Sequence, residues 1–429
     1  MIIRALLTAV SLIAVSTAGS AAPTYIHAGR VMAVPGKPML GPSTIIVDGG
    51  RIVSVQAGHV AAPAGAAMVD LRDKIILPGL IDSHVHLASD RAGLEGAAAA
   101  LSDSDELGAF ETQFNGMKTL RAGFTTVRNL GDGGAVMALR DAIGRGWVQG
   151  PRIVDAGQSI STTGGHMDRR NGISDEMAER LPAPENLCDG PDECRKVVRN
   201  QIGRGADVIK FATTGGVNSG TGLATRMLEA EARALVETAH AYGRKVAVHA
   251  HGAEGIKLAL RAGADSIEHG TVMDAEIIAL MKRNGTYYVP TLSTVNGYLE
   301  RLAANPNAYR PEVKKQIDWR IGITGQSLLK AVPAGVKIAF GTDAGVSKHG
   351  RNADEFELMV KYGMTPTEAI KAATVNAADL LGLASEIGTI EPGKSADLIA
   401  VTGDPLVDVR ALKSVDFVMA RGEVVTSTR

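Results

Sequence analysis

Two histidines one residue apart are the first candidates for chemistry in this chain. His84 and His86 stand in "DSHVHL", directly after the apolar run "IILPGLI". In a strand, residues i and i+2 point to the same side, so both imidazoles would enter one space. Two neutral imidazoles pack poorly in a core but are good metal ligands. An H-x-H pair alone is weak evidence, so further ligands must come from elsewhere in the chain.

Five more polar residues interrupt or follow short apolar runs. They are Lys210 in "DVIKFATTGG", His249 and His251 in "VHAHG", His269 in "IEHGT" and Asp343 in "FGTDAG". The gaps between these segments are of the order of one to three strand–helix units, each about 30 residues long in a barrel. We therefore expect all of these side chains at one end of a set of parallel strands. Four histidines and an aspartate around one opening can hold two divalent cations.

The lysine of this group stands at a position that predicts an inward side chain. A protonated ammonium beside two cations would be repelled, so the pKa of Lys210 should fall and its neutral amine could react with carbon dioxide. The resulting carbamate is anionic and has two oxygens, which suits it to bridging a metal pair. The alternative is a lysine that reaches solvent or pairs with a carboxylate. Within this ring of ligands we expect N6-carboxylysine at Lys210.

The middle of the chain repeats a short apolar strand, a glycine-containing turn and a helical stretch. The eight strand candidates are "IILPGLIDSHVHL", "FTTVRNLG", "RIVDAGQSIS", "ADVIKFATTGG", "KVAVHAHG", "ADSIEHGT", "TYYVPTLS" and "VKIAFGTDAG". Eight such units in series predict an α/β fold, a (β/α)₈ TIM barrel over residues 78–388, with its active site at the C-terminal strand ends. A doubly wound open sheet is the alternative, but no G-x-G-x-x-G follows the first strand.

The two ends of the chain have a β texture instead. "IIVDGGRIVSVQAG" predicts a hairpin near the start, and "ADLIAVTGD" and "VDFVMARGEVVTS" predict strands near the end. We expect residues 23–77 and 389–429 to pack together as one small composite β-sandwich domain.

The first 22 residues predict a signal peptide. "MIIR" is a short basic start, "ALLTAVSLIAV" an apolar stretch and "STAGSAA" a small-residue cleavage region. A membrane anchor is the alternative, but the apolar stretch is too short to span a bilayer. The mature protein is therefore expected to be soluble and exported, either periplasmic or secreted. A net charge of −1 argues against nucleic acid or an anionic membrane as partner.

The chain has two cysteines, Cys188 and Cys194, in the polar stretch "LCDGPDEC". In an oxidising compartment they are expected to form a small disulfide, and two unpaired thiols are the alternative. No CxxC pair or third cysteine supports a metal site there.

The motifs "LPGLIDSHVHL", "VIKF", "VHAHG", "IEHGT" and "FGTDAG" resemble the amidohydrolase superfamily over nearly the whole mature chain. "TTVRNLGD", "STTGGHMD" and "GTIEPGKSADLIAV" are similar to its secreted prolidase-like and imidazolonepropionase-like branch, which includes carboxypeptidase-type dipeptidases and ochratoxinase. The resemblance implies that one metal is held by His84, His86 and Asp343 and the other by His249 and His269, with carbamylated Lys210 and a hydroxide bridging. Zinc suits these ligands, although manganese, cobalt or iron would also fit. Homo-oligomers up to octamers occur in this branch.

The resemblance also implies a mechanism. The bridging hydroxide attacks an amide carbonyl, and Asp343 passes its proton to the departing nitrogen. His251 is expected to form a hydrogen bond with the scissile carbonyl or its oxyanion. The alternative is that it only supports the metal ligands and does not touch the substrate. His166 in "TTGGHMD" is the second candidate for substrate binding. The remaining histidines His27, His59, His240 and His349 are expected on the surface.

The branch commonly cleaves amide bonds to a C-terminal amino acid, as in dipeptides, N-acyl amino acids and ochratoxin A. A cation for the free carboxylate is then expected, and the candidates in or beside strand-end loops are Arg128, Arg169, Arg170, Lys348 and Arg351. Three other classes stay open. A cyclic-amide hydrolase would share the binuclear set, a ring deaminase typically lacks the lysine, and a non-catalytic scaffold would have lost ligands.

Overall fold

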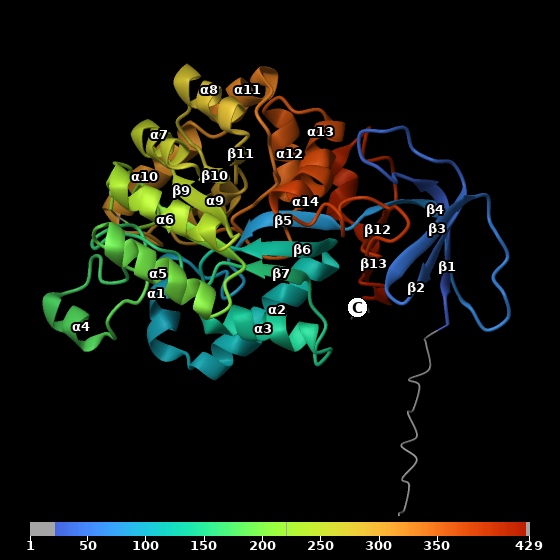
Figure 1. Cartoon of the computed structure of the whole chain (residues 1–429), viewed down its shortest axis with the longest axis horizontal. Helices are drawn as coiled ribbons and strands as arrows, with labels where there is room; N and C mark the ends of the chain where they lie inside the picture. The colour runs from blue at the N-terminus through green and yellow to red at the C-terminus, as the bar shows by residue number, and fades with distance from the viewer. Residues whose placement is uncertain (1–21, 220, 426–429) are drawn as a thin grey trace, which may run out of the picture.

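The computed structural model describes residues 22–219 and 221–425 of the chain (Figure 1). The expected signal peptide lies outside the described residues except for Ala22. Among the described residues, none of the helices has both the length and the apolar character required to cross a membrane.

A seven-stranded sheet joins the two ends of the chain. Its strand order is β14-β13-β12-β4-β1-β2-β3, and β4 pairs in parallel with β1 and antiparallel with β12. The strands from the start and from the end of the chain lie side by side in Figure 1. Their apolar side chains share one hydrophobic cluster, which includes Ile26, Ile76, Leu398 and Met419. The bounds are β1 Thr24–Val31, β2 Ser43–Asp48, β3 Arg51–Ala57, β4 Ala67–Pro78, β12 Leu398–Val401, β13 Val415–Ala420 and β14 Glu423–Val424.

The middle of the chain forms two parallel sheets. One has the order β5-β6-β7 and the other β11-β10-β9-β8. Single parallel bridges link them: Ile160 pairs with Phe211 of β8, Tyr288 of β11 with Ile338, and Val85 of β5 with Ala344. The segment expected as the eighth strand thus forms bridges at two residues and no regular strand. The bounds are β5 Leu80–Val85, β6 Phe124–Asn129, β7 Arg152–Asp155, β8 Val208–Ala212, β9 Lys245–Ala250, β10 Ser266–His269 and β11 Tyr287–Val289.

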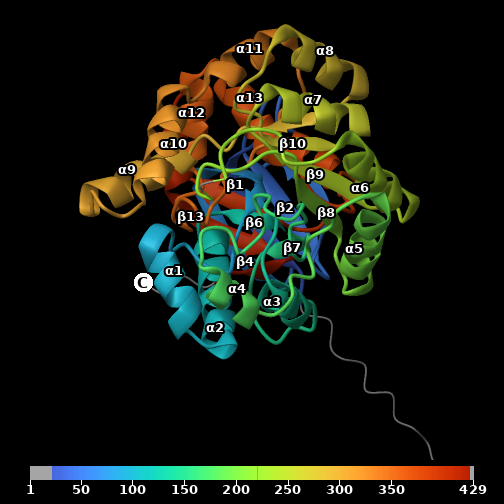
Figure 2. The same cartoon turned by 90° about the vertical axis from the view of Figure 1, so that its left-hand side faces the viewer.

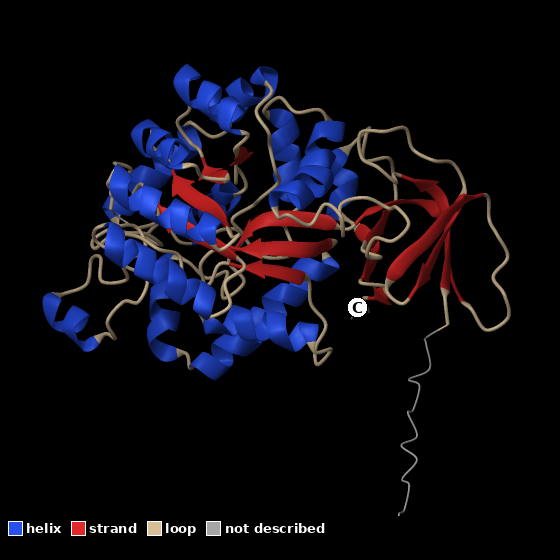
Figure 3. Ribbon diagram, viewed as in Figure 1, coloured by secondary structure: helices blue, strands red, loops and turns tan. Residues whose placement is uncertain are grey.

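Helices cover the outside of these parallel strands (Figures 2 and 3). The expected helical stretches after β8 and β9 are present as α6 and α7. Gly263 follows α7, and its φ of 98° is the left-handed C-cap conformation typical of glycine. The bounds are α1 Gly93–Ser102, α2 Asp105–Arg121, α3 Gly134–Gly144, α4 Asp175–Arg180, α5 Pro191–Gly203, α6 Glu229–Ala241, α7 Ala253–Ala262, α8 Ala275–Asn284, α9 Thr294–Ala304, α10 Pro311–Gly322, α11 Gln326–Ala334, α12 Asp354–Lys361, α13 Pro366–Lys371 and α14 Ala377–Leu380.

One glycine fixes the passage from the seven-stranded sheet into the parallel strands. Gly79 stands between β4 and β5, and a Cβ there would lie 2.1 Å from Thr125 Oγ1. Its N–H donates to the carbonyl of Asp397, and the next residue, Leu80, donates to the carbonyl of Gly123. Only glycine permits this close approach, and it sets where β5 delivers the first histidines.

Cys188 and Cys194 form a disulfide with an S–S distance of 2.06 Å at the start of α5. Both cysteines are buried in the main hydrophobic cluster. The bridge therefore fastens the loop that leads into α5 to the core of the molecule.

Candidate metal centre

The residues singled out from the sequence come together in one place. His84 lies in β5, Lys210 in β8, His249 in β9, and His269 at the end of β10, so four parallel strands contribute to the site. A cavity of about 110 Å³ is lined by the whole predicted set, namely His84, His86, His166, Lys210, His249, His251, His269 and Asp343.

The distances between possible ligand atoms match those of a metal site. His84 Nε2 and His86 Nε2 lie 3.5 and 3.4 Å from Asp343 Oδ1. Neighbouring donors around tetrahedral zinc are roughly 3.5 Å apart, because each is about 2.0–2.2 Å from the ion. Donor atoms of His84, His269 and Asp343 lie within 4.8 Å of one another, and so do those of His249, His251 and His269. The two groups share His269 and therefore adjoin, and the single free ring nitrogen of His269 can bind one ion.

The ring nitrogens that face away from the cavity have partners of their own. His84 Nδ1 lies 2.8 Å from Glu268 Oε2, His269 Nδ1 lies 2.8 Å from Thr291 Oγ1, and His249 Nε2 donates to the carbonyl of Gly215 at 3.2 Å. Such bonds fix the tautomer and orientation of a metal-binding imidazole. They leave Nε2 of His84, Nε2 of His269 and Nδ1 of His249 for a cation.

A buried ion pair supports the first of these histidines. Arg128 donates to Glu268 Oε1 at 2.8 Å and to the carbonyl of Ser83 at 2.6 Å. Burial would raise the pKa of Glu268, but the charge of Arg128 and the hydrogen bond from His84 outweigh it and lower that pKa to about 2. Arg128 is thus paired in the protein interior. The prediction that it could bind a substrate carboxylate was wrong.

Arg128→Met is expected to lower the free energy of unfolding by about 3–5 kcal/mol, because it leaves Glu268 charged and unpaired in the interior. Urea unfolding at equilibrium measures this. The matched control is Arg140→Met, which removes a partly exposed partner of Asp207 and should cost less than about 1 kcal/mol. Similar losses in both variants would show that the interior pair is not critical.

The lysine of the site has neither of the alternative roles considered from the sequence. Lys210 is 1% exposed, so it does not reach solvent. Its Nζ makes no hydrogen bond or ion pair with any residue that the structure describes. Burial lowers the pKa of Lys210 to about 8, although the charges of Glu268 and Asp343 oppose this. A buried amine with depressed pKa, surrounded by imidazoles, fits a group that gains its partners by modification and metal binding.

The backbone is held in an unusual conformation at the strand ends. His269, Thr291 and Asp343 have φ values of 69°, 47° and 60°, in the left-handed region that residues other than glycine rarely adopt. The Asp343 N–H donates to the carbonyl of His84 at 2.7 Å, which fixes one of these turns. Such strain gathers at functional sites because the surrounding contacts impose it.

Two further histidines complete the cavity. His251 is buried, its Nδ1 lies 2.8 Å from Thr271 Oγ1, and its ring stacks on that of His269 with centroids 4.8 Å apart. His166 stacks on His249 at 4.3 Å, and its buried Nδ1 has no hydrogen-bond partner among the described residues. Burial lowers the pKa of His166 to about 4, so its ring is neutral and can accept a hydrogen bond from a ligand.

Sequence reasoning missed the residues that orient the rings, Glu268, Thr291 and Thr271, and three more. Asp132 Oδ1 lies 3.4 Å from His86 Nδ1 and orients that ring, and Tyr298 and Arg320 line the cavity. Asp132 stands in the quoted stretch "TTVRNLGD", three residues after the end of β6, so its position offered a signal. The positions of Tyr298 and Arg320 in α9 and α10 offered none.

The other candidate cations do not line the cavity. Arg170 pairs with Asp168, Lys348 with Asp90, and Arg351 with both Glu300 and Asp354. Arg169 is exposed in the loop that carries His166.

The expectation of four surface histidines was wrong for two of them. His349 is 2% exposed, and its Nε2 donates to the carbonyl of His86 at 3.0 Å. His27 is buried in β1. His59 and His240 are exposed. His349 therefore helps to hold the segment that begins at His86.

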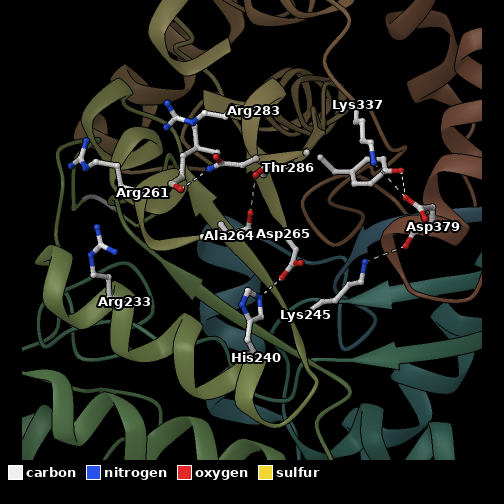
Figure 4. A pocket seen from close by; sticks show the side chains of 15 residues that line it. Arg233, His240, Lys245, Arg261, Ala264, Asp265, Arg283, Thr286, Lys337 and Asp379 are labelled. Atoms are coloured by element: carbon white, nitrogen blue, oxygen red, sulfur yellow. Dashed lines mark hydrogen bonds and ion pairs between the residues drawn. The ribbon is translucent and has the colours of Figure 1, made fainter. Parts of the chain in front are cut away.

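A larger hollow of about 740 Å³ lies at the opposite ends of the strands (Figure 4). Lys245 begins β9, Tyr287 begins β11, and Arg261 and Arg283 stand in the last turns of α7 and α8. Basic side chains in these last turns compensate the negative ends of helix dipoles. No group of metal-ligating residues was found there among the described residues. Its position at the N-terminal strand ends is also typical of stability rather than catalysis.

Comparison with known proteins shows the family to which the chain belongs. The sequence profile described as the amidohydrolase family matches residues 75–425. A solved Xaa-Pro dipeptidase with methionine bound in its active site has a TM-score of 0.90 and 41% identity, over 95% of this chain and 100% of the other. A prolidase complexed with N-methylphosphonate-L-proline has a TM-score of 0.84 and 32% identity, and the match covers 94% of this chain and 99% of the prolidase. Ochratoxinase of Aspergillus niger is 30% identical over 417 residues, 93% of this chain and 85% of the relative.

The chain belongs to the amidohydrolase family, as its motifs indicated. It is a hydrolase that acts on amide bonds, and its fold is the α/β fold of that family.

Proposed function

We propose that the chain is a binuclear metal hydrolase that cleaves the amide bond to a C-terminal amino acid in dipeptides and N-acyl amino acids. The observation that carries this proposal is the single cavity in which Lys210, buried and without a hydrogen-bond partner among the described residues, lies with six histidines and Asp343. The two parallel sheets and their bridges would close as a (β/α)₈ barrel over residues 78–388 around this cavity. Residues 23–77 and 389–429 would form the composite β-sandwich domain.

His84, His86 and Asp343 would hold one cation, and His249 and His269 the other, with carbamylated Lys210 between them. Zinc is the ion best suited to these donors. When bound, such a pair supplies a polarised carbonyl and a water of lowered pKa. The outward partners Glu268, Gly215 and Thr291 would orient the ligand rings for this role.

Different residues around the cavity would transfer the proton, stabilise the developing negative charge and bind the substrate. Asp343 takes the proton of the attacking water and delivers it to the departing nitrogen, acting as general base and then general acid. His251, fixed by Thr271, offers its other ring nitrogen to the scissile carbonyl oxygen as negative charge develops there. His166 contributes its unpartnered Nδ1 to substrate binding.

The preference for a C-terminal amino acid is supported by the relatives. One solved neighbour is an Xaa-Pro dipeptidase with methionine in its active site, and another is a prolidase with N-methylphosphonate-L-proline. The relative from Aspergillus niger is an ochratoxinase, which extends the proposed substrate range to ochratoxin A.

The experiment is a hydrolysis panel with the zinc-loaded mature protein. It varies the C-terminal residue of dipeptides and N-acyl amino acids among Phe, Arg, Lys, Met and Pro, and adds ochratoxin A, cyclic amides and an aminated ring compound. Turnover of the open-chain substrates with a free carboxylate is expected. Turnover of cyclic amides alone, or release of ammonia from the ring compound alone, would overturn the proposed substrate class.

We also propose export of the mature protein to the periplasm or medium after removal of residues 1–22, and assembly into a homo-oligomer as large as an octamer. Amino-terminal sequencing of the exported protein and its mass in solution would test both statements.

A further inference from the structure

The proposed reaction cavity contains a buried guanidinium that has no carboxylate partner in the described part of the chain. Arg320 of α10 is 3% exposed and lines the cavity together with the predicted metal ligands. Its Nη1 donates to Thr324 Oγ1 at 3.1 Å and its Nη2 to the carbonyl of Thr291 at 3.3 Å. No described carboxylate lies within ion-pair distance of it. By contrast Arg128, which is equally buried, is paired with Glu268.

A buried cation without a counterion is costly, so its presence needs an explanation. Arg320 uses two hydrogen bonds to described residues, whereas a guanidinium has five N–H donors in a planar fork. The remaining donors suit a carboxylate, which a guanidinium binds with two parallel hydrogen bonds. We infer that Arg320 receives the α-carboxylate of the C-terminal residue of the substrate. This inference rests on the proposed function and names the group that gives it its substrate class.

One residue connects this cation to the metal centre. Thr291 accepts the Arg320 hydrogen bond with its carbonyl, while its hydroxyl lies 2.8 Å from Nδ1 of His269. Its backbone is in the left-handed region, with φ of 47°, so the two groups face different partners from a fixed turn. The separation between a bound carboxylate and the scissile bond is thereby set by a single rigid segment. A substrate whose carboxylate lies at another distance from the scissile nitrogen should then bind less well.

The rest of the substrate has space beside this cavity. His166 and Met167 line both the reaction cavity and a neighbouring hollow of about 340 Å³. A substrate held at Arg320 by its carboxylate would place its C-terminal residue in the small inner cavity and direct its acyl part toward the larger hollow. The acyl group would then be less restricted in size than the C-terminal residue.

The test compares an N-acetyl amino acid with its C-terminal amide, which has the same scissile bond but no negative charge. The amino acid is the one that the hydrolysis panel ranks first. Arg320→Met is expected to lower kcat/KM for the free acid by about 30- to 1,000-fold, mainly through KM, because a buried partner of the carboxylate is lost. The amide, which is the poorer wild-type substrate, should change by less than about threefold. Arg320→Lys should recover part of the lost activity, since it keeps the charge but not the fork.

The control is Lys314→Met, which removes a positive charge from the same helix at an exposed position paired with Asp318. It should leave both substrates unchanged. Metal content is measured in every variant. Equal losses for acid and amide in Arg320→Met at full metal content, or an unaffected acid, would overturn the inference.

A second measurement keeps the inference separate from the proposed function. Binding of the free amino acid and of its amide to the zinc-loaded protein is followed by calorimetry, with methionine as the probe if the panel shows no turnover. Wild-type protein is expected to bind the acid more tightly, and Arg320→Met to lose that preference. Absent hydrolysis with this pattern intact would refute the proposed function alone. Equal affinity for acid and amide in wild-type protein, or no binding of either, would refute the carboxylate site.

Discussion

Asp343→Asn is expected to lower kcat by about 10³-fold, within the range that general acid–base catalysis contributes. The carboxylate lies 3.5 and 3.4 Å from the Nε2 atoms of His84 and His86, at the point where those rings meet the cavity. Asparagine keeps an oxygen atom that can ligate a metal and has nearly the same volume, but it cannot take up and release a proton at neutral pH. The measurements are kcat on the best substrate of the panel, the metal content and the circular dichroism spectrum.

The control for this variant is Asp90→Asn. Asp90 is also buried and charged, but its partners are Lys118 and Lys348 and it does not line the cavity. Its replacement should leave kcat within about threefold of the wild-type value, since charge changes away from the reacting atoms remove no transition-state interaction. An Asp343→Asn protein with kcat within tenfold of wild type would contradict the assignment of Asp343 as the proton carrier.

Lys210→Met is expected to lower the metal content from about two ions per chain to about one or none, and activity by on the order of 10³-fold. Methionine fills a similar volume but has no amine for carbon dioxide, so the anionic bridge between the cations is lost. Metal analysis and kcat/KM measure the two effects. Wild-type protein prepared with ¹³C-bicarbonate should also show a carbamate carbon signal that is missing from Lys210→Met.

Lys257→Met is the matched control, because Lys257 is paired with Glu276 on the outer helices and should keep full metal content. A Lys210→Met protein that binds two ions and turns over normally would contradict the bridging role. So would wild-type protein that takes up no label.

Most of the residues that line the cavity could be predicted because they stand in or directly after a strand end. A short apolar run followed by a polar residue is a local pattern, and the parallel arrangement of the strands then places His84, His249 and His269 at the same end. The two β segments at the chain ends were also recognisable from their local texture, and the structure places both in one seven-stranded sheet.

Contacts between distant parts of the chain could not be predicted in this way. Arg128 stands in β6 and Glu268 in β10, and nothing near either residue indicates that they pair behind His84. Arg320 stands in a helix whose local pattern is amphipathic, and its role follows only from the cavity it enters. His349 was expected on the surface because it stands in a likely loop, yet its ring donates a hydrogen bond to the carbonyl of His86.

The eighth strand shows a limit of another kind. Its sequence has the composition of a strand, and it bridges β11 at Ile338 and β5 at Ala344. The left-handed backbone at Asp343 interrupts regular pairing between these points. A conformation imposed by the site therefore outweighs the local propensity of the segment.

The most direct test of the central proposal is the activity of metal-free protein as zinc is added in measured equivalents. With bicarbonate present, activity should rise to a plateau at about two equivalents per chain, as expected for a two-metal site. Full activity at one equivalent, or in the metal-free protein, would contradict the binuclear centre.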